Sequence, residues 1–278
     1  MPIFTPFTFI APPIVTGGGG DADATAYLAE VVNQGGTVDA TITSAVNTLF
    51  TDLKAAGIYS KLVVMYPFIG GVANAHSINA LDPISGSAHY FIEWVGPWTH
   101  SSNGAQGNGS STGANTWLEN SVDFPTFADS GGNRHICVYT NADSGVTTFG
   151  YDWGGGAGFT NFMAVNYGGT SQYSGFGAYT SNSQTSNTGF YTGQITGSRQ
   201  SNFKNGSEVG FNTGRSDQST NHYMSIGCDN RITVPGFTVT EVTDKRYAFA
   251  AAGAALTTTE NADYSTAVTT FQTALSRN

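Results

Sequence analysis

The sequence predicts a mainly β protein, an antiparallel β-sandwich or jelly roll, with two helices before the strands and one helix after them. Two observations lead to this fold class. Short runs rich in aromatic and β-branched residues follow one another between residues 58 and 251, separated by Gly, Asn, Ser and Thr. Apolar residues at helical spacing occur only before and after that region. Consecutive strands without helices between them favour stacked antiparallel sheets.

Residues 1–20 are predicted to form an apolar arm. They carry Phe4, Phe7, Phe9 and Ile10, and no charged side chain. Four prolines discourage both a helix and a central strand. Because such a segment buries itself poorly, we expect it to anchor the protein, either in another subunit or in a groove of its own domain. A secretory signal is not predicted, because the N-terminal segment lacks the positive charge with which such signals begin.

A helical segment is predicted over residues 21–57. Asp21 or Asp23 is a suitable N-cap for a first helix, which ends at Gly35-Gly36. The apolar face of this helix is expected to carry Leu28, Val31 and Val32. A second helix starts near Asp39 and ends before Gly57. Its apolar stripe consists of Ile42, Val46, Leu49 and Leu53.

Residues 58–278 are predicted to form the sandwich domain. The expected strands are residues 62–66, 89–95, 135–139, 161–167, 175–179, 189–195, 223–227 and 247–251. Asn205-Gly206 predicts a two-residue hairpin turn, because both positions tolerate positive φ. Residues 101–115 are expected to form a long exposed loop. A capping box at Thr257 and Glu260 begins a closing helix over about 257–277, with Tyr264, Val268, Phe271 and Leu275 on its apolar face.

Composition excludes several partners. The chain has 278 residues and a net charge of −9, from ten Lys and Arg against nineteen Asp and Glu. No Lys or Arg occurs between Lys61 and Arg134. Nucleic-acid binding depends on cations that meet phosphates, so we expect none here. Insertion into a membrane is not expected either, since no apolar run approaches 18 residues.

No motif predicts a reaction centre. The residues from Gly17 to Ala22 match a dinucleotide loop formally, but Asp21 and Asp23 would repel a pyrophosphate. Gly109 to Gly113 matches G-x-S-x-G without the flanking strand and helix that a nucleophile elbow needs. The five histidines lack metal-ligand spacing, although folding could bring His89 and His100 together. We therefore expect no enzyme activity, no catalytic residue, no metal and no cofactor, and we interpret Cys137 and Cys228 as buried free thiols.

Aromatic residues form the more informative group, at 13% of the chain. Sugars bind by stacking their apolar faces on Trp or Tyr rings, with hydrogen bonds from Asn and Asp. The alternative is that these rings fill the sandwich core. Trp98 and Trp153 lie nearest to turn signals. They are therefore the predicted glycan-binding residues, together with Tyr151.

Residues 39–83 resemble a segment of tailed-phage virion proteins. The similarity covers the run from Asp39 to Leu62 and continues through Tyr66-Pro67-Phe68-Ile69-Gly70-Gly71 and His76-Ser77-Ile78-Asn79-Ala80-Leu81-Asp82-Pro83. In that family a helix leads into a "YPxxGG…H…N…DP" stretch and then into a concanavalin-like or laminin-G-like sandwich. Later matches include residues 98–104, 197–199, 203–206 and 246–250, and a closing helix similar to residues 256–275.

The resemblance implies a non-enzymatic virion structural protein of a bacteriophage, displayed on the particle surface as a tail or head fibre, spike or decoration component. Residues 1–38 depart from the family pattern, so they are expected to encode the attachment point. The alternative is a glycan-binding protein for host adsorption. The expected partners are other virion proteins, copies of the chain (a trimer is common among such fibres) and a host-surface glycan. The expected location is the virion, after assembly in the host cytoplasm.

Overall fold

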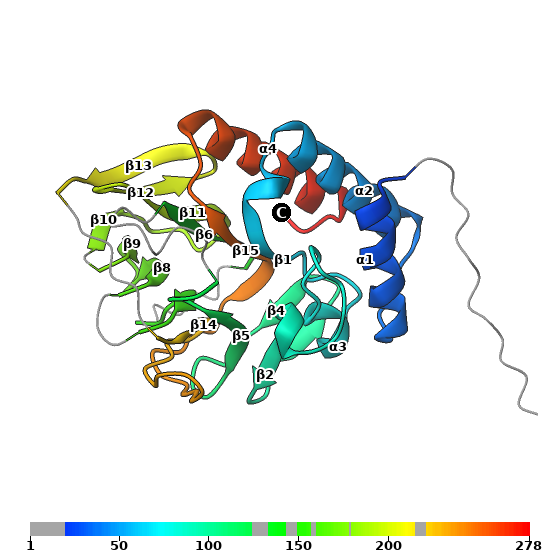
Figure 1. The fold of residues 1–278 in the computed structure, drawn as a ribbon, viewed down its shortest axis with the longest axis horizontal. Helices are drawn as coiled ribbons and strands as arrows, with labels where there is room; N and C mark the ends of the chain where they lie inside the picture. The colour runs from blue at the N-terminus through cyan, green and yellow to red at the C-terminus, as the bar shows by residue number, and fades with distance from the viewer. Residues whose placement is uncertain (1–19, 124–132, 143–148, 157–159, 178, 215–220) are drawn as a thin grey trace, which may run out of the picture.

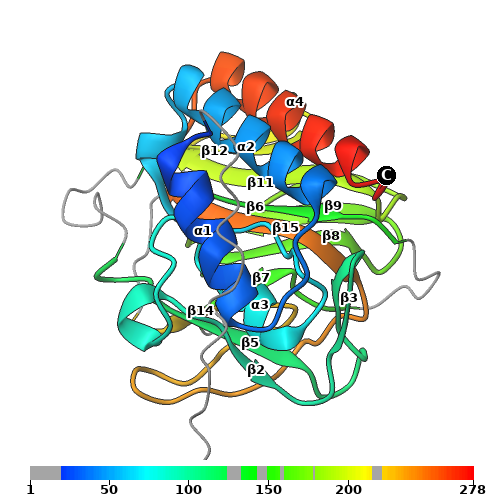
Figure 2. The same ribbon diagram turned by 90° about the vertical axis from the view of Figure 1, so that its right-hand side faces the viewer.

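The computed structural model describes residues 20–123, 133–142, 149–156, 160–177, 179–214 and 221–278. The predicted anchoring residues Phe4, Phe7, Phe9 and Ile10 lie outside these ranges. Three layers make up the described chain: a group of helices, an inner sheet A and an outer sheet B (Figure 1, Figure 2). The fold is thus a mainly β sandwich of two antiparallel sheets, as predicted.

Sheet A contains eight strands, and seven of them follow the order β13-β12-β11-β6-β15-β4-β3. β1 pairs with the later part of β15, alongside β4 at its start. The strands are β1 (Leu62–Tyr66), β3 (Thr99–Ser101), β4 (Gly104–Gln106), β6 (Arg134–Thr140), β11 (Gly189–Thr196), β12 (Arg199–Lys204), β13 (Ser207–Asn212) and β15 (Arg246–Ala254). The hairpin between β12 and β13 turns at Asn205-Gly206, where both residues have positive φ, as the sequence predicts.

Sheet B contains seven strands in the order β10-β9-β8-β7-β14-β5-β2. They are β2 (Glu93–Val95), β5 (Gly113–Glu119), β7 (Trp153–Gly154), β8 (Phe162–Tyr167), β9 (Ser171–Gly175), β10 (Tyr179–Ser183) and β14 (Tyr223–Ile226). Every pairing in both sheets is antiparallel.

One apolar core lies between the two sheets. Sheet A contributes Ile136, Val138 and Tyr247, and sheet B contributes Trp153 and Met163. All five are buried because successive strand residues point to opposite faces. A second core lies between the other face of sheet A and the helices, and it includes Phe249 of β15. Sheet A is therefore covered on both faces.

Three long helices form the helical layer: α1 (Ala22–Asn33), α2 (Ala40–Ala55) and α4 (Thr258–Ala274) (Figure 2). α2 and α4 pack together over sheet A, and α1 packs beside α2. Asp21 and Asp39 cap the first two, and Thr257 with Glu260 forms a complete capping box on the third. The predicted N-terminal pair and closing helix are confirmed. Shorter elements are α3 (Ala73–His76) and the 3₁₀ turns η1 (Tyr59–Lys61) and η2 (Ser87–His89).

Several sequence-based predictions need correction. The segment 175–179 is not one strand but the connection between β9 and β10. Residues 101–115 are not an exposed loop, because they contain β4 and the start of β5, and Thr112 to Asn115 are buried. Only the end of 89–95 is a strand. Val32 is 43% exposed and does not belong to the buried face of α1.

Candidate functional site: an aromatic band on sheet B

The outer face of sheet B carries the candidate site, at the end formed by β8, β9 and β10. In β9, Gln172 and Ser174 are buried on the inner side, so Tyr173 between them points outward. In β10, Thr180 is buried, and Tyr179 before it is 43% exposed. The helices lie over the opposite sheet, on the far side of the molecule from this face (Figure 1).

Aromatic rings from four segments form a continuous band on this face, hereafter the aromatic band. Ring centroids are 5.1 Å apart between Phe149 and Tyr167, 5.6 Å between Tyr167 and Tyr173, and 5.7 Å between Tyr173 and Tyr179. Tyr151 and Phe162 complete the band, stacked at 4.6 Å beneath it. Phe149 at one end is 64% exposed, so both ends of the band face solvent.

Hydroxyl groups accompany the rings. The register of β9 and β10 sets Ser181 directly opposite Tyr173, and Ser183 directly opposite Ser171. Directly paired residues of an antiparallel sheet share one face, so these serines lie beside the aromatic band. Ser181 and Ser183 are exposed. The surface therefore combines apolar ring faces with hydrogen-bonding groups, as an amphipathic ligand requires.

A charged trio borders the band. The Arg231 guanidinium donates from Nε to Asp229 Oδ2 at 2.8 Å and from Nη2 to Glu241 Oε1 at 3.0 Å. The Tyr151 amide donates to the Glu241 carbonyl at 2.8 Å, which attaches the trio to the base of the band. Burial raises the pKa of Asp229 to about 6, against the opposing effect of Arg231. Burial and then the charge of Glu241 also raise the pKa of Tyr167.

The structure brings one of the three predicted glycan residues to this site. Tyr151 lies in the band, but it is only 5% exposed and supports the other rings rather than facing solvent. Trp153 is fully buried between the sheets, and its Nε1 donates to the Cys137 carbonyl at 3.0 Å. The prediction that Trp153 lies at the surface is wrong, because β7 points this ring into the core.

Trp98 lies elsewhere, near β2 at the opposite edge of sheet B. Its ring is half-buried, 4.9 Å from Trp94, and its Nε1 donates to the Gly113 carbonyl at 3.2 Å. His76 and His100 join these indoles, with their Nδ1 atoms 3.0 Å apart. Burial lowers their pKa values to about 3 and about 4, so both imidazoles are neutral at pH 7.

The pairing of His89 with His100 that folding could have allowed is not the one that the structure shows. His89 pairs instead with Asp82, its Nδ1 2.6 Å from Oδ2. His100 is instead hydrogen-bonded to His76. Within the described ranges, no group of three or more His, Cys, Asp or Glu is arranged to hold a metal ion.

The two cysteines are buried and free, as predicted. Burial raises the pKa of both thiols to about 12, which leaves them protonated and unreactive at neutral pH. The serine of the G-x-S-x-G match, Ser111, lies in a turn in which its amide donates to Asn108 Oδ1 at 2.9 Å. That turn leads into β5, so Ser111 does not occupy the strand-to-helix position of a nucleophile elbow.

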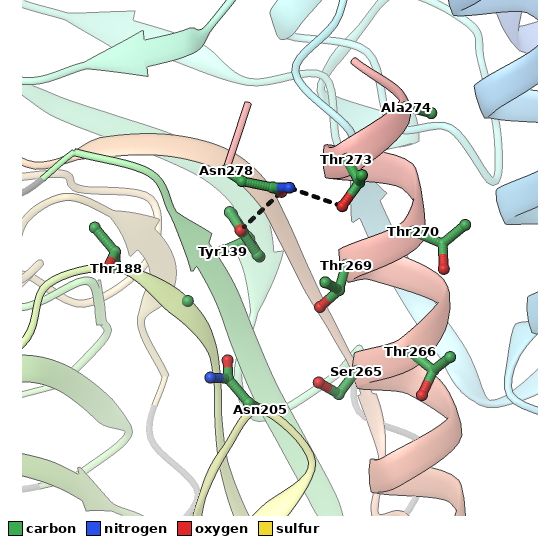
Figure 3. A pocket seen from close by; sticks show the side chains of 11 residues that line it. Tyr139, Thr188, Asn205, Ser265, Thr266, Thr269, Thr270, Thr273, Ala274 and Asn278 are labelled. Atoms are coloured by element: carbon green, nitrogen blue, oxygen red, sulfur yellow. Dashed lines mark hydrogen bonds between the residues drawn. The ribbon is translucent and has the colours of Figure 1, made fainter. Parts of the chain in front are cut away.

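A groove of about 860 Å³ lies on the other side of the molecule, between α4 and the β6–β11 face (Figure 3). α4 presents Ser265, Thr269 and Thr273 to it (Figure 3). Tyr139 and Asn278 meet at one end, with their polar atoms 3.5 Å apart. Hydroxyl groups, two Asn side chains and small residues make up the described lining.

The described part of the chain holds no helix that is both long and apolar enough to cross a membrane. The aromatic residues that the sequence analysis missed are Phe149, Tyr167, Tyr173 and Tyr179. The alternation in residues 171–175 and 179–183, with polar or small residues on either side of each tyrosine, is a signal that could place Tyr173 and Tyr179 on an exposed face.

No family model matches the chain, and no curated protein sequence matches it. Among solved structures, domain 4 of an extracellular GH43 arabinanase from Geobacillus stearothermophilus, in complex with arabinotriose, superposes on 74% of this chain and 98% of its own. Its TM-score is 0.48 and its identity 12%. A Trypanosoma rangeli sialidase gives a TM-score of 0.44 at 9% identity over 79% of this chain. The binding domain of a botulinum neurotoxin of serotype D/C gives 0.46 at 6% identity over 76%. The chain spans 38% of that sialidase and 53% of that toxin chain, and likenesses of this size assign neither a family nor a function.

Proposed function

We propose that the protein is a non-catalytic glycan-binding module, and that the aromatic band is its binding surface. The observation that carries this proposal is a row of four outward-facing rings, Phe149, Tyr167, Tyr173 and Tyr179, with adjacent centroids 5.1 to 5.7 Å apart. Contiguous apolar patches on the surface of a folded protein are often binding sites. The C–H faces of sugars stack on such rings, while their hydroxyl edges take hydrogen bonds.

The charged trio supports binding rather than hydrolysis. Two carboxylates beside an aromatic surface are the residue types that glycosidases use. Here, however, the side chain of Asp229 is only 1% exposed, and its Oδ2 is held by Arg231. An acid sealed in this way cannot deliver a proton to a glycosidic oxygen lying on the rings.

The test is a binding survey with substitutions at the two exposed ends of the band. Tyr179→Ala and Phe149→Ala remove solvent-facing rings, so neither should change the fold. Each ring–sugar stack is worth about 1 kcal/mol, and the double variant should lose about tenfold or more in affinity for polysaccharides or host-cell envelopes.

Phe211→Ala is the matched control. Phe211 is 58% exposed on β13, at the edge of the other sheet, so its loss should leave binding unchanged. Absence of glycan binding, or equal binding by the double variant, would refute the proposal. Shortening of a polysaccharide by the protein would show a hydrolase instead.

A second proposal is that the module is displayed on a phage particle. The sequence resemblance of residues 39–83 to tailed-phage virion proteins supports it. The expected result is detection of the chain in purified particles by mass spectrometry, and of its sandwich on the particle surface by cryo-electron microscopy. Particles that lack the chain would remove this proposal and leave the glycan proposal standing.

A further inference from the structure

The charged trio beside the aromatic band has one cation and two carboxylates, and therefore a net charge of −1. Arg231 bonds both Asp229 and Glu241, so one cation lies between two carboxylates. The next basic residue in this stretch, Lys245, is 2% exposed at its side chain and is bound to Asp152. Both cations are therefore already paired with carboxylates.

A sugar acid needs an unpaired cation, and the charged trio does not supply one. Its carboxylate or sulfate accepts hydrogen bonds only, and it binds well where a guanidinium or ammonium is unpaired. At the band it would meet a trio of net charge −1, on a chain of net charge −9. This repulsion acts over about 10 Å at 0.1 M salt.

An uncharged sugar finds complementary groups. The hydrogen bonds of Arg231 to Asp229 and Glu241 use two of the five N–H groups of a guanidinium, and its side chain is 41% exposed. Glu241, 32% exposed at its side chain, presents a carboxylate next to that guanidinium. A fixed donor beside a fixed acceptor fits neighbouring hydroxyl groups, each of which both donates and accepts.

We infer that the aromatic band selects uncharged glycans: a ring face stacks on Tyr167, and vicinal hydroxyls at its edge bond Arg231 and Glu241. This inference rests on the proposed function and adds the substrate class to it. Uronic acids, sialic acids and sulfated sugars are excluded by the same trio.

The experiment compares two charge forms of one polymer. Fully methyl-esterified homogalacturonan and its de-esterified form share a backbone and differ in carboxylate charge, as do hydroxyethyl- and carboxymethyl-cellulose. Affinity electrophoresis with both pairs at low salt should retard the protein at least tenfold more strongly with the neutral form. Glu241→Gln removes one negative charge from the trio, so it should reduce the ratio of neutral to acidic binding about threefold.

Glu208→Gln is the matched control. Glu208 pairs with Arg199 on β12 and β13, at side-chain exposures of 28% and 41%, which resemble those of Glu241 and Arg231. It changes the net charge equally, but lies off the band and should leave the preference unchanged. Arg231→Lys keeps the positive charge but loses the planar array of guanidinium N–H donors, so it should weaken binding of the neutral polymers at least threefold.

Equal or tighter binding of the acidic forms would overturn the inference while leaving the proposed function intact. Equal effects of Glu241→Gln and Glu208→Gln would also overturn it, since they would make the preference a property of net charge alone. Failure of both neutral and acidic polymers and of the wider glycan survey to bind would remove the proposed function itself.

Discussion

The Lys245 ammonium lies 2.7 Å from Asp152 Oδ2, with both side chains buried. The same carboxylate accepts from the Val165 amide at 2.6 Å and from the Tyr247 hydroxyl at 2.8 Å. Asp152 thus ties β8 of sheet B to β15 of sheet A. Because Tyr151 precedes Asp152 and β8 carries two other rings of the aromatic band, this buried acid fixes the base of the proposed binding surface.

Replacing one partner of this pair should strongly destabilise the fold. Lys245→Met leaves the Asp152 carboxylate buried without its cation, and we expect a loss of about 3–5 kcal/mol in the free energy of unfolding. The double variant Asp152→Asn with Lys245→Met should recover part of that loss, because no uncompensated charge remains. Urea denaturation of the two variants and the parent protein measures this, and a loss below 1 kcal/mol for Lys245→Met would contradict it.

Local signals account for what the sequence predicts well. The capping box at Thr257 and the apolar stripe from Tyr264 to Phe271 predict α4 from residues that are close together in the sequence. The structure has both features. The two N-terminal helices and most central strands are similarly defined by neighbouring residues. Asn205-Gly206 sets its hairpin through its own backbone preferences.

The candidate site follows from contacts that are distant in sequence. The band joins β8, β9 and β10 to residues 149–151, and its charged edge comes from residues 229–241. No local pattern specifies these meetings. The surface prediction for Trp153 is wrong for the same reason: the turn signal at residues 151–154 favours the surface, whereas the hydrogen bonds of Asp152 hold this segment in the core.

The capping box offers a small and well-defined stability test. Thr257 Oγ1 accepts from the Glu260 amide at 3.2 Å, and the Glu260 carboxylate accepts from the Thr257 amide at 2.7 Å. Thr257→Ala should lower the free energy of unfolding by about 1 kcal/mol. Thr258→Ala, one residue later in the first turn of α4, lacks the capping role and should cost much less. Equal midpoints of thermal unfolding for the two variants would show that the cap contributes nothing.

The Trp98 ring packs directly against Gly227, where a side chain would leave no room for it. The φ of Gly227 is +75°, and a Cβ there would lie 2.7 Å from Trp98 Cη2. Gly227→Ala therefore combines a left-handed conformation, at about 1–2 kcal/mol, with overpacking against the indole, at about 1–3 kcal/mol. We expect a lower thermal midpoint and a shifted tryptophan emission. Gly197→Ala, at φ +58° with open space around it, is the control and should show the backbone cost alone.

Buried histidines should make the fold sensitive to acid. Burial lowers the pKa of His76 to about 3 and that of His135 to about 4, against 6.5 in the unfolded chain. Between these values the unfolded state binds more protons, so stability falls as the pH drops from about 6.5 towards 4. Each of the two contributes a slope of up to about 1.4 kcal/mol per pH unit.

Asp229 acts in the opposite sense. Burial raises its folded pKa to about 6 from 3.8, so its contribution is present at low pH and is lost as the pH rises through 6. Two buried histidines oppose this one acid, so we expect the urea midpoint to decrease as the pH is lowered from 6.5 to 4.5. His135→Gln should flatten this dependence by removing one of the protonations. A midpoint that stays constant or rises on acidification would show that these imidazoles are hydrated and able to carry charge in the folded protein.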